Sequence, residues 1–438
     1  LMISKPKGTY DILPQEINSW TKLESTIRKI CRIYNYKEIR TPLFEAYEVF
    51  HRDENDASDM VTKETYDFSD RADRRLTLRP EGTAGVVRAY VENKLYADRT
   101  VAKLFYMGSM FRYERPQKGR TRQFNQFGIE ALGSDDPLLD AEVIALGYAL
   151  IKALGLKDVT VKINTLGDAE SRTRYKDVLV DYFKIHQEEL CSDCQVRLAK
   201  NPLRILDCKI DREKPFFKQA PKMNDYLNEA SKKRFEAVLK ALDEMKIPYT
   251  IDEHLVRGLD YYSHTVFELE VHLKDFGAQN VIGGGGRYDS MVEQMGGPAT
   301  PGIGMAFGME RLLLASQLAG KNLSSNDFVH VYFIALGQAA QEACLREMNV
   351  CRLGGLSCDM DFTGKSLKAQ FKSADLNRAL FTCILGDNEL KEFTINIKDN
   401  QTDEQETISL YDVYPYVLKK IHERSGSACA SCKEKEVK

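Results

Sequence analysis

The chain has 438 residues, of which 43% are hydrophobic and 29% are charged, and its 62 Lys and Arg against 65 Asp and Glu give a net charge of −3. This length predicts about two or three domains, each large enough for its own core. The balance of charges excludes a basic nucleic-acid coat over the whole surface, but not local basic patches. The ordinary composition excludes wholesale disorder and a fibrous structure, and we expect a soluble, multidomain enzyme.

Membrane spans and secretion are not predicted. No stretch reaches the ~18 consecutive apolar residues that a membrane span needs. The first residues carry charge without a following apolar core, so they do not predict a secretory signal. Ten cysteines spread over a long chain without such a signal favour reduced thiols and a cytoplasmic location.

Hydrophobic periodicity predicts the elements in the first part of the chain. Apolar residues at three- and four-residue steps predict a helix over 16–34, and a strand over 38–45 contains Pro42, which marks an edge or an end. The next expected elements are a helix over 81–95, strands over 102–110 and 123–133 around a charged loop, a helix over 137–154 and a strand over 159–165.

The sequence becomes helical and charged from about 168 to 250, which predicts an insertion between pieces of one catalytic sheet. Strands return at 265–273 and at 280–282, where the second strand runs into four glycines. An apolar helix is expected over 304–319 and closes a domain that spans 1–325.

Beyond this domain, strands and helices alternate over 326–425. Such alternation predicts a small α/β domain with a mixed or parallel sheet. Residues 426–438 are expected to form a charged tail.

The densest chemical signal is a loop over 112–122, between two expected strands. Its one acid is Glu114, and its local charge is +4 because it carries five basic residues, namely Arg112, Arg115, Lys118, Arg120 and Arg122. Arginine binds phosphate with two hydrogen bonds, so the loop suits a polyphosphate or an RNA end. A solvated charged turn is the alternative.

Four other clusters carry polar groups, and each has an ordinary structural alternative. Glu81 and Thr83 lie at a helix start, where an acid also serves as a cap. The segment 255–262 mixes charge, glycine and two tyrosines, as an ordinary turn can. The glycines over 283–286 permit a close approach of the backbone to a ligand, or else a tight turn. The segment 302–311 places one arginine on a helix that otherwise consists of core residues.

Taken together and in this order, these segments resemble the histidyl-tRNA synthetases, which are class II aminoacyl-tRNA synthetases. The segments that carry the resemblance are the start at 7–14, the three class motifs at 39–50, 108–133 and 302–314, and the histidine-specific segments at 255–262 and 284–289. The resemblance covers essentially the whole chain. It implies an α+β catalytic domain built on a mostly antiparallel sheet with the class II motifs, a helical insertion and a C-terminal α/β anticodon-binding domain.

The resemblance implies a two-step reaction. The histidine carboxylate attacks the α-phosphate of ATP to give histidyl-adenylate, and the terminal ribose of tRNA(His) then takes the histidyl group. Because the carboxylate is already ionised, the first step needs charge neutralisation and in-line positioning, which arginines and Mg²⁺ can provide. The first motif also implies a homodimer.

The resemblance also assigns residues to the ATP site. Arg112 and Arg257 would contact the α-phosphate, Arg257 in a place where related enzymes rely on a metal ion. Arg311 would contact the γ-phosphate, and its side chain and Phe124 would sandwich the adenine. Glu114 belongs to the same ATP-binding set.

A second set would bind L-histidine. Glu81 and Thr83 would hold its α-ammonium group, and Gln126 would assist with its carboxylate. The residues expected to contact the imidazole are Glu130, Tyr262 and Tyr288, with Tyr261 beside them. A carboxylate and a tyrosine hydroxyl can pair with the two ring nitrogens, so an amino acid without these nitrogens would be rejected by ~10⁴ without editing.

Some positions depart from the family pattern. Asn125 stands where many relatives have histidine, and Thr121 where an aromatic residue is common; both lie near the loop that would meet the tRNA end. The domain over 326–425 carries 11 Lys and Arg against 15 Asp and Glu. Its RNA-binding face must therefore be a local patch with base-specific contacts.

The alternative function is a catalytically silent, synthetase-like regulatory subunit of histidine biosynthesis. Such proteins keep the fold but lose the anticodon domain and parts of the histidine-specific segments. Here the key arginines and a C-terminal α/β domain are present, which favours the enzyme.

No metal site is predicted outright. Cys191 and Cys194, with His186 before them and Cys208 after, offer enough ligands for zinc. A single Cys-x-x-Cys with loosely spaced partners is weak evidence, so free buried thiols are the favoured interpretation.

Overall fold

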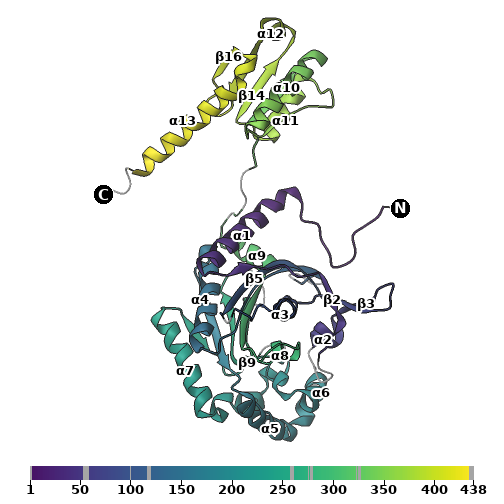
Figure 1. Ribbon diagram of the computed structural model, residues 1–438, viewed down its shortest axis with the longest axis vertical. Coiled ribbons are helices and arrows are strands. Elements are labelled where there is room, and N and C mark those ends of the chain that lie inside the picture. The colour runs from purple at the N-terminus through teal and green to yellow at the C-terminus, as the bar shows by residue number, and fades with distance from the viewer. Residues whose placement is uncertain are drawn as a thin grey trace. The chain divides into compact units, whose positions relative to one another are not determined.

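The computed structural model describes residues 2–52, 59–98, 100–115, 120–256, 261–274, 276, 280–321, 323 and 327–433, with the side chains of 59, 62 and 425–433 left out. The chain forms two compact units, Leu1–Ser324 and Ser325–Lys438, and each is treated by itself (Figure 1). Within the described part of the chain, no helix is long and apolar enough to span a bilayer.

An eight-stranded sheet, counted over the described residues, forms the centre of the first unit, in the order β1-β5-β6-β11-β10-β9-β7-β8. Neighbours pair antiparallel except β1 with β5 and β7 with β8, so the predicted mostly antiparallel sheet is confirmed. The strands are β1 (Lys37–Glu38), β5 (Ala102–Phe111), β6 (Gln123–Leu132), β7 (Val159–Thr165), β8 (Tyr249–Ile251), β9 (Ser263–Val271), β10 (Val281–Tyr288) and β11 (Gly302–Gly308).

Helices cover both faces of this sheet. Figure 1 shows α3 and α8 inside the curve of the sheet, and α1, α4 and α7 outside it. The outer helices bury residues such as Leu23, Ile144 and Val238 in one large core with the sheet, whereas Val87 and Met291 pack on the inner face. The helices are α1 (Pro14–Ile33), α2 (Asp59–Lys63), α3 (Thr83–Glu92), α4 (Pro137–Ala153), α7 (Glu229–Glu244), α8 (Met291–Gln294) and α9 (Met309–Leu318).

The strand expected over 38–45 is wrong. Its two ends belong to different sheets. At one end, Lys37–Glu38 pairs with β5 of the large sheet. At the other end, β2 (Phe44–Ala46) forms a small sheet with β3 (Tyr66–Ser69) and β4 (Arg75–Leu78), and the short helix η1 (Tyr47–Val49) follows β2. Pro42 lies between the ends and has no N–H for a ladder. The side chain of Arg79 joins the two regions, since it donates to the carbonyls of Thr41 at 3.0 Å and Ser109 at 2.9 Å.

The helix expected to begin at 304 is also wrong in its first part, because Gly302–Gly308 is strand β11 and the helix starts at Met309. A short apolar run cannot be assigned to helix or strand by periodicity alone. The four glycines before Arg287 lie inside β10 rather than in a turn. A Cβ at Gly285 would lie 1.9 Å from the carbonyl oxygen of Gly304, so glycine lets the two strands approach.

The insertion has a core of its own, distinct from that of the sheet, with Tyr175, Phe183 and Phe217 at its centre. Its elements are α5 (Ala169–Ile185), η2 (Gln187–Glu189), α6 (Ser192–Lys200), η3 (Pro202–Ile205), η4 (Asp211–Glu213), η5 (Pro215–Gln219) and η6 (Met223–Tyr226). The next helix, α7, instead buries Phe235 and Leu242 in the core of the sheet. The insertion core therefore leaves α7 out, and it is completed by Leu255, Val256, Tyr262 and Val266 from the chain after α7.

The second unit is an α/β domain with a mixed sheet, as predicted. Its strand order is β13-β12-β14-β15-β16, with the first three parallel. The elements are β12 (Val331–Ala335), α10 (Gln338–Leu353), β13 (Cys358–Met360), α11 (Leu367–Leu376), β14 (Phe381–Leu385), α12 (Asp387–Glu392), β15 (Thr394–Asp399), β16 (Gln405–Ser409), η7 (Leu410–Asp412) and α13 (Val413–Lys433). Residues 426–433, expected in a tail, continue helix α13.

A buried ion pair joins α4 to β10. Arg287 and Asp140 are both fully buried, with Nε of Arg287 3.0 Å from Asp140 Oδ1. Asp140 also accepts a hydrogen bond from the Thr265 hydroxyl at 2.6 Å, and Arg287 donates to the carbonyl of Ser134 at 2.9 Å. A buried charge is tolerated only when it is paired and hydrogen-bonded, so this network fixes the end of β10 that carries Tyr288.

Asp140→Ala should destabilise the fold by about 3–5 kcal/mol, because it removes the fully buried carboxylate that pairs with Arg287. The remaining carboxylate, that of Asp289, is partly exposed and lies 3.5 Å from the guanidinium. Glu142→Ala, on the same helix, is the matched control: its pair with Lys103 is partly exposed and should contribute about 0–1 kcal/mol. Urea unfolding of both variants measures the difference. Equal losses would contradict the structural role assigned to Asp140.

Candidate active site

A cavity of about 690 Å³ opens at one end of β6. Its volume falls in the range of roughly 300–1,000 Å³ that is usual for small-molecule sites. The cavity is lined by Gln126 and by all the described residues that are expected to bind ATP, which are Arg112, Glu114, Phe124 and Arg311. Residues that are 200 positions apart in the sequence therefore meet at one cavity, as the resemblance implies.

The two arginines are held by backbone carbonyls. Arg112 Nε donates to the carbonyl of Pro80 at 2.9 Å, and its guanidinium lies 5.3 Å from the centre of the Phe124 ring. Arg311 Nε donates to the carbonyl of Val281 at 3.0 Å. The guanidinium over Phe124 is thus that of Arg112, whereas Arg311 lies 4.9 Å from the ring of Phe276.

Gln126 on β6 also lines the cavity. Its Oε1 atom is buried and has no hydrogen-bond partner among the described residues. A buried acceptor without a partner costs free energy unless a ligand or a water supplies a donor. The cavity therefore offers an unpaired acceptor to a ligand.

Other charged residues of the cavity could not be found from the sequence. Lys162 on β7 pairs with Glu270 at 3.1 Å, and Arg212 of the insertion lies 3.8 Å from Asp252. Lys209 also lines the cavity. No spacing relates these positions to the arginine-rich loop, because only the fold brings the insertion against the sheet.

A second, buried polar cluster surrounds Glu130. Its Oε1 accepts a hydrogen bond from the Thr83 hydroxyl at 2.7 Å, and its Oε2 accepts one from the Tyr288 hydroxyl. The rings of Tyr261 and Tyr288 lie 5.8 Å apart, and those of Tyr261 and Tyr262 lie 4.7 Å apart. Five of the residues expected to bind histidine therefore meet, from α3, β6, β10 and the start of β9.

Glu81 serves as a helix cap. Its carboxylate accepts hydrogen bonds from the backbone N–H groups of Thr83 at 2.6 Å and Ala84 at 2.9 Å, at the first turn of α3. Glu81 thus caps the helix, which is the structural alternative to histidine binding that the sequence left open. The helix dipole also favours an acid at a helix N-terminus. The same geometry places a second carboxylate near Glu130.

Burial raises the pKa of Glu130 to about 8, although hydrogen bonds from Tyr288 and Thr83 lower it; the charge of Glu81 raises it further. The carboxyl therefore holds a proton over part of the neutral range when no ligand is bound. A ligand that donates an N–H to it would favour the ionised form.

Two features of this cluster have no signal in a single sequence. The ring of Tyr106 lies where a Cβ on Gly82 or Gly128 would collide with it, so both glycines make room for a buried tyrosine. A Cβ on Gly304 would lie 1.8 Å from Glu130 Oε2. The glycine of the third motif thus leaves space for the carboxylate on the neighbouring strand.

The remaining predicted residues divide into three groups. Arg257 lies outside the described residues. Thr121 lines the cavity, and Asn125 donates through its backbone and side chain to Glu310, at 2.8 and 3.0 Å. Cys191 and the two cysteines after it lie in the insertion core and do not themselves line this cavity.

A curved, mostly antiparallel sheet with an arginine-lined cavity at a strand end, in a chain that also has a separate α/β unit, is the arrangement of a class II aminoacyl-tRNA synthetase. The family profile described as histidyl-tRNA synthetase matches residues 8–171 and 197–312, and the profile described as anticodon binding domain matches 330–420. The chain belongs to the histidyl-tRNA synthetase family.

Relatives and solved structures agree with this assignment. The histidine–tRNA ligase of Acholeplasma laidlawii is 52% identical over 406 residues, which cover 93% of this chain and 96% of the relative. That of Bacillus cytotoxicus is 49% identical over 422 residues, or 96% and 100% of the two chains. The crystal structure of apo S. aureus histidyl-tRNA synthetase matches with a TM-score of 0.81 and 41% identity over 95% of this chain and 100% of that one.

A Bacillus halodurans structure named as an ATP phosphoribosyltransferase regulatory subunit/histidyl-tRNA synthetase has 20% identity and a TM-score of 0.62, over 88% of this chain and 99% of its own. At that identity the likeness shows the fold alone.

Glu130→Gln should remove a pH dependence of stability. Because the folded carboxyl keeps a proton that the unfolded chain releases, native stability should fall as the pH rises from about 4.5 to about 8. Glutamine cannot titrate, so the variant lacks this loss of stability. The difference in the free energy of unfolding, variant minus wild type, should therefore increase as the pH rises through this range. Urea unfolding of both proteins at a series of pH values measures it, and a constant difference would contradict the raised pKa.

Proposed function

We propose that this chain joins L-histidine to tRNA(His) in an ATP-dependent reaction with a histidyl-adenylate intermediate. The observation that carries the proposal is the meeting of Arg112, Phe124, Gln126 and Arg311 at one cavity in a chain about 50% identical to histidine–tRNA ligases over almost its whole length.

In the first step, a histidine carboxylate oxygen attacks the α-phosphorus of ATP, and the bond to pyrophosphate breaks. Arg112 is suited to hold the α-phosphate, because its Nε is anchored on Pro80 while its guanidinium lies on the cavity. Such anchoring reduces the reorganisation needed when charge develops in the transition state. Arg311 is suited to the far end of the triphosphate, and Arg257 to the opposite side of the α-phosphate by family resemblance.

Binding of histidine is assigned to the cluster around Glu130. Its carboxylate can accept an imidazole N–H, and a tyrosine hydroxyl can pair with the other ring nitrogen. Both oxygens of Glu130 already receive hydroxyl donors, from Thr83 and Tyr288. These hydroxyls orient the carboxylate, and a side chain without ring nitrogens would leave the buried groups unpaired. Gln126 lines the cavity and offers an unpaired acceptor to the substrates.

Mg²⁺ is expected from the family, and the oxygen donors of the cavity fit it. This ion binds through one or two carboxylates plus substrate phosphates. Glu114, which lines the cavity near Arg112, would hold it. The ion would supply charge neutralisation on the polyphosphate.

The remaining proposals concern assembly and partners. The second unit, matched by the anticodon-binding profile, is proposed to bind the anticodon of tRNA(His). A homodimer through the first motif is supported by the exposure of Leu43 and Phe44. A cytoplasmic location is supported by the eight described cysteines, none of which is in a disulfide.

Histidine-dependent exchange of labelled pyrophosphate into ATP tests the function directly. The enzyme should catalyse exchange with L-histidine and not with other amino acids, and should then charge tRNA(His). The silent regulatory subunit would show neither activity. Absence of exchange by folded, full-length protein would reject the proposed function in favour of that alternative.

Arg112→Ala should slow adenylate formation by about 10²–10³, because it removes a preorganised donor from the reacting phosphate. The half-saturating histidine concentration should change little, since the imidazole cluster is intact. Arg115→Ala is the matched control, because Arg115 is an exposed arginine of the same loop. Pyrophosphate exchange measures both, and equal rates for the two variants would reject the role of Arg112.

A further inference from the structure

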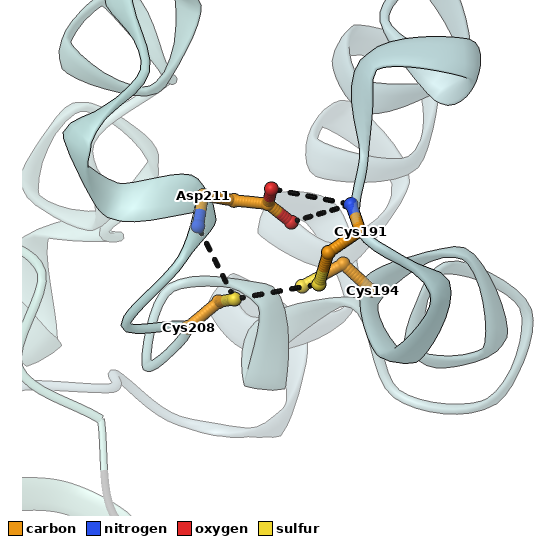
Figure 2. A group of neighbouring side chains, drawn as sticks. All are labelled: Cys191, Cys194, Cys208 and Asp211. Carbon is orange, nitrogen blue, oxygen red and sulfur yellow. Dashed lines mark hydrogen bonds between the residues drawn. The ribbon is translucent and has the colours of Figure 1, made fainter.

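Three cysteines and one aspartate of the insertion point their side chains at a common point (Figure 2). They are Cys191, Cys194, Cys208 and Asp211, and their sulfur atoms and one carboxylate oxygen all lie within 4.8 Å of one another. Cys194, Cys208 and Asp211 are buried, and Cys191 is partly buried.

One sulfur–sulfur distance matches a tetrahedral metal site. The Sγ atoms of Cys191 and Cys208 are 3.7 Å apart. Around a tetrahedral zinc ion with Zn–S bonds of about 2.3 Å, two sulfur ligands lie about 3.8 Å apart. The pair is far outside disulfide bonding distance, which is about 2.05 Å.

The sequence supplies the ligands as two pairs with the same spacing, Cys191-x-x-Cys194 and Cys208-x-x-Asp211. The first pair spans the start of α6, with Cys191 as its N-cap, and the second pair ends at the start of η4. Two pairs with two intervening residues each resemble the pattern of a zinc ribbon, with Asp211 in place of the fourth cysteine and 13 residues between the pairs. Asp211 completes the set, whereas His186 does not belong to it: its ring stacks on Phe216.

Hydrogen bonds orient the ligands. The backbone N–H of Asp211 donates to Cys208 Sγ at 3.4 Å, and that of Cys191 donates to the two carboxylate oxygens of Asp211 at 3.1 and 3.2 Å. Lys214 Nζ lies 2.7 Å from Asp211 Oδ1. Such outer contacts fix metal ligands, and Oδ2 keeps a lone pair for a metal bond.

We propose that the insertion holds a structural zinc ion, bound by the thiolates of Cys191, Cys194 and Cys208 and by the carboxylate of Asp211. Four protein ligands leave no open position for a substrate, so the site is structural rather than catalytic. On binding, the three thiols lose their protons to solvent and form three Zn–S bonds, and no oxidation occurs. Lys214 offsets part of the resulting negative charge.

Packing alone does not account for this arrangement. Buried free cysteines behave as small apolar groups and pack without an acid, yet here a fully buried carboxylate sits among three sulfur atoms. The histidyl-tRNA synthetase profile leaves 172–196 unmatched, so the first ligand pair is not a part of the chain that the family description covers.

The ion would act on the active site through one wall of the cavity. Leu206 and Asp207 directly precede Cys208, and Lys209 and Arg212 lie next to ligands; all four line the cavity at β6. Zinc would therefore hold this wall against the sheet.

Metal analysis of the full chain, purified under reducing conditions without chelator, tests the proposal. Wild type should contain about one zinc ion per chain, and Co²⁺ should replace it with the visible absorption of a tetrahedral thiolate complex. Cys194→Ser should lose both signals. Cys31→Ser, at a buried thiol of α1, is the matched control and should keep both.

A second variant, Asp211→Asn, is needed in case Cys194→Ser does not fold. The asparagine amide has the same shape as the aspartate carboxylate. This variant should fold, and should release zinc to a chelator about 10–100-fold more readily than wild type. Folded wild type that holds no zinc as isolated and takes up neither Zn²⁺ nor Co²⁺ on titration would overturn the proposal, as would a Cys191–Cys208 disulfide found by mass spectrometry. Aminoacylation is measured separately, so the loss of this proposal would leave the enzymatic function standing.

Discussion

A carboxylate buried between a helix and a sheet organises the candidate active site. Glu130 is fully enclosed, and an acid in that position requires donors from its surroundings. The donors come from Thr83 on α3 and Tyr288 on β10, and the third neighbour, β11, contributes Gly304, where any side chain would collide with the acid. The sheet register and the placement of α3 are therefore both tied to one side chain.

The alternation of strand β6 separates the functional face from the core. Phe127 and Ile129 point into the main core, whereas Gln126 and Glu130 point to the inner face with the cavity and the polar cluster. Successive side chains of a strand must face opposite ways, so the same ten residues stabilise the fold and carry the site. The ion pair of Arg287 and Asp140 also links the fold to the site, because it anchors strand β10, which ends in Tyr288.

Long, strongly periodic elements could be predicted from the sequence, and α1, α4, β5 and β6 lie close to where they were expected. The errors fall where local pattern is ambiguous: the apolar run of β11 suits either helix or strand, and Pro42 interrupts what the pattern presents as one strand. The candidate ATP residues form one cavity because each belongs to a recognisable motif. Lys162 and Arg212 could not be predicted, since only the tertiary packing of the insertion brings them there. For Arg257 the assignment stays a prediction.

The central claim is that Arg112, at the cavity, binds the phosphate, and that Glu130, in the buried polar cluster, binds the imidazole. An experimental structure with a non-hydrolysable histidyl-adenylate analogue tests it most directly. The account predicts the phosphate on Arg112, and the ring between Glu130 and a tyrosine hydroxyl. An analogue bound elsewhere, or with its imidazole turned away from Glu130, would contradict it.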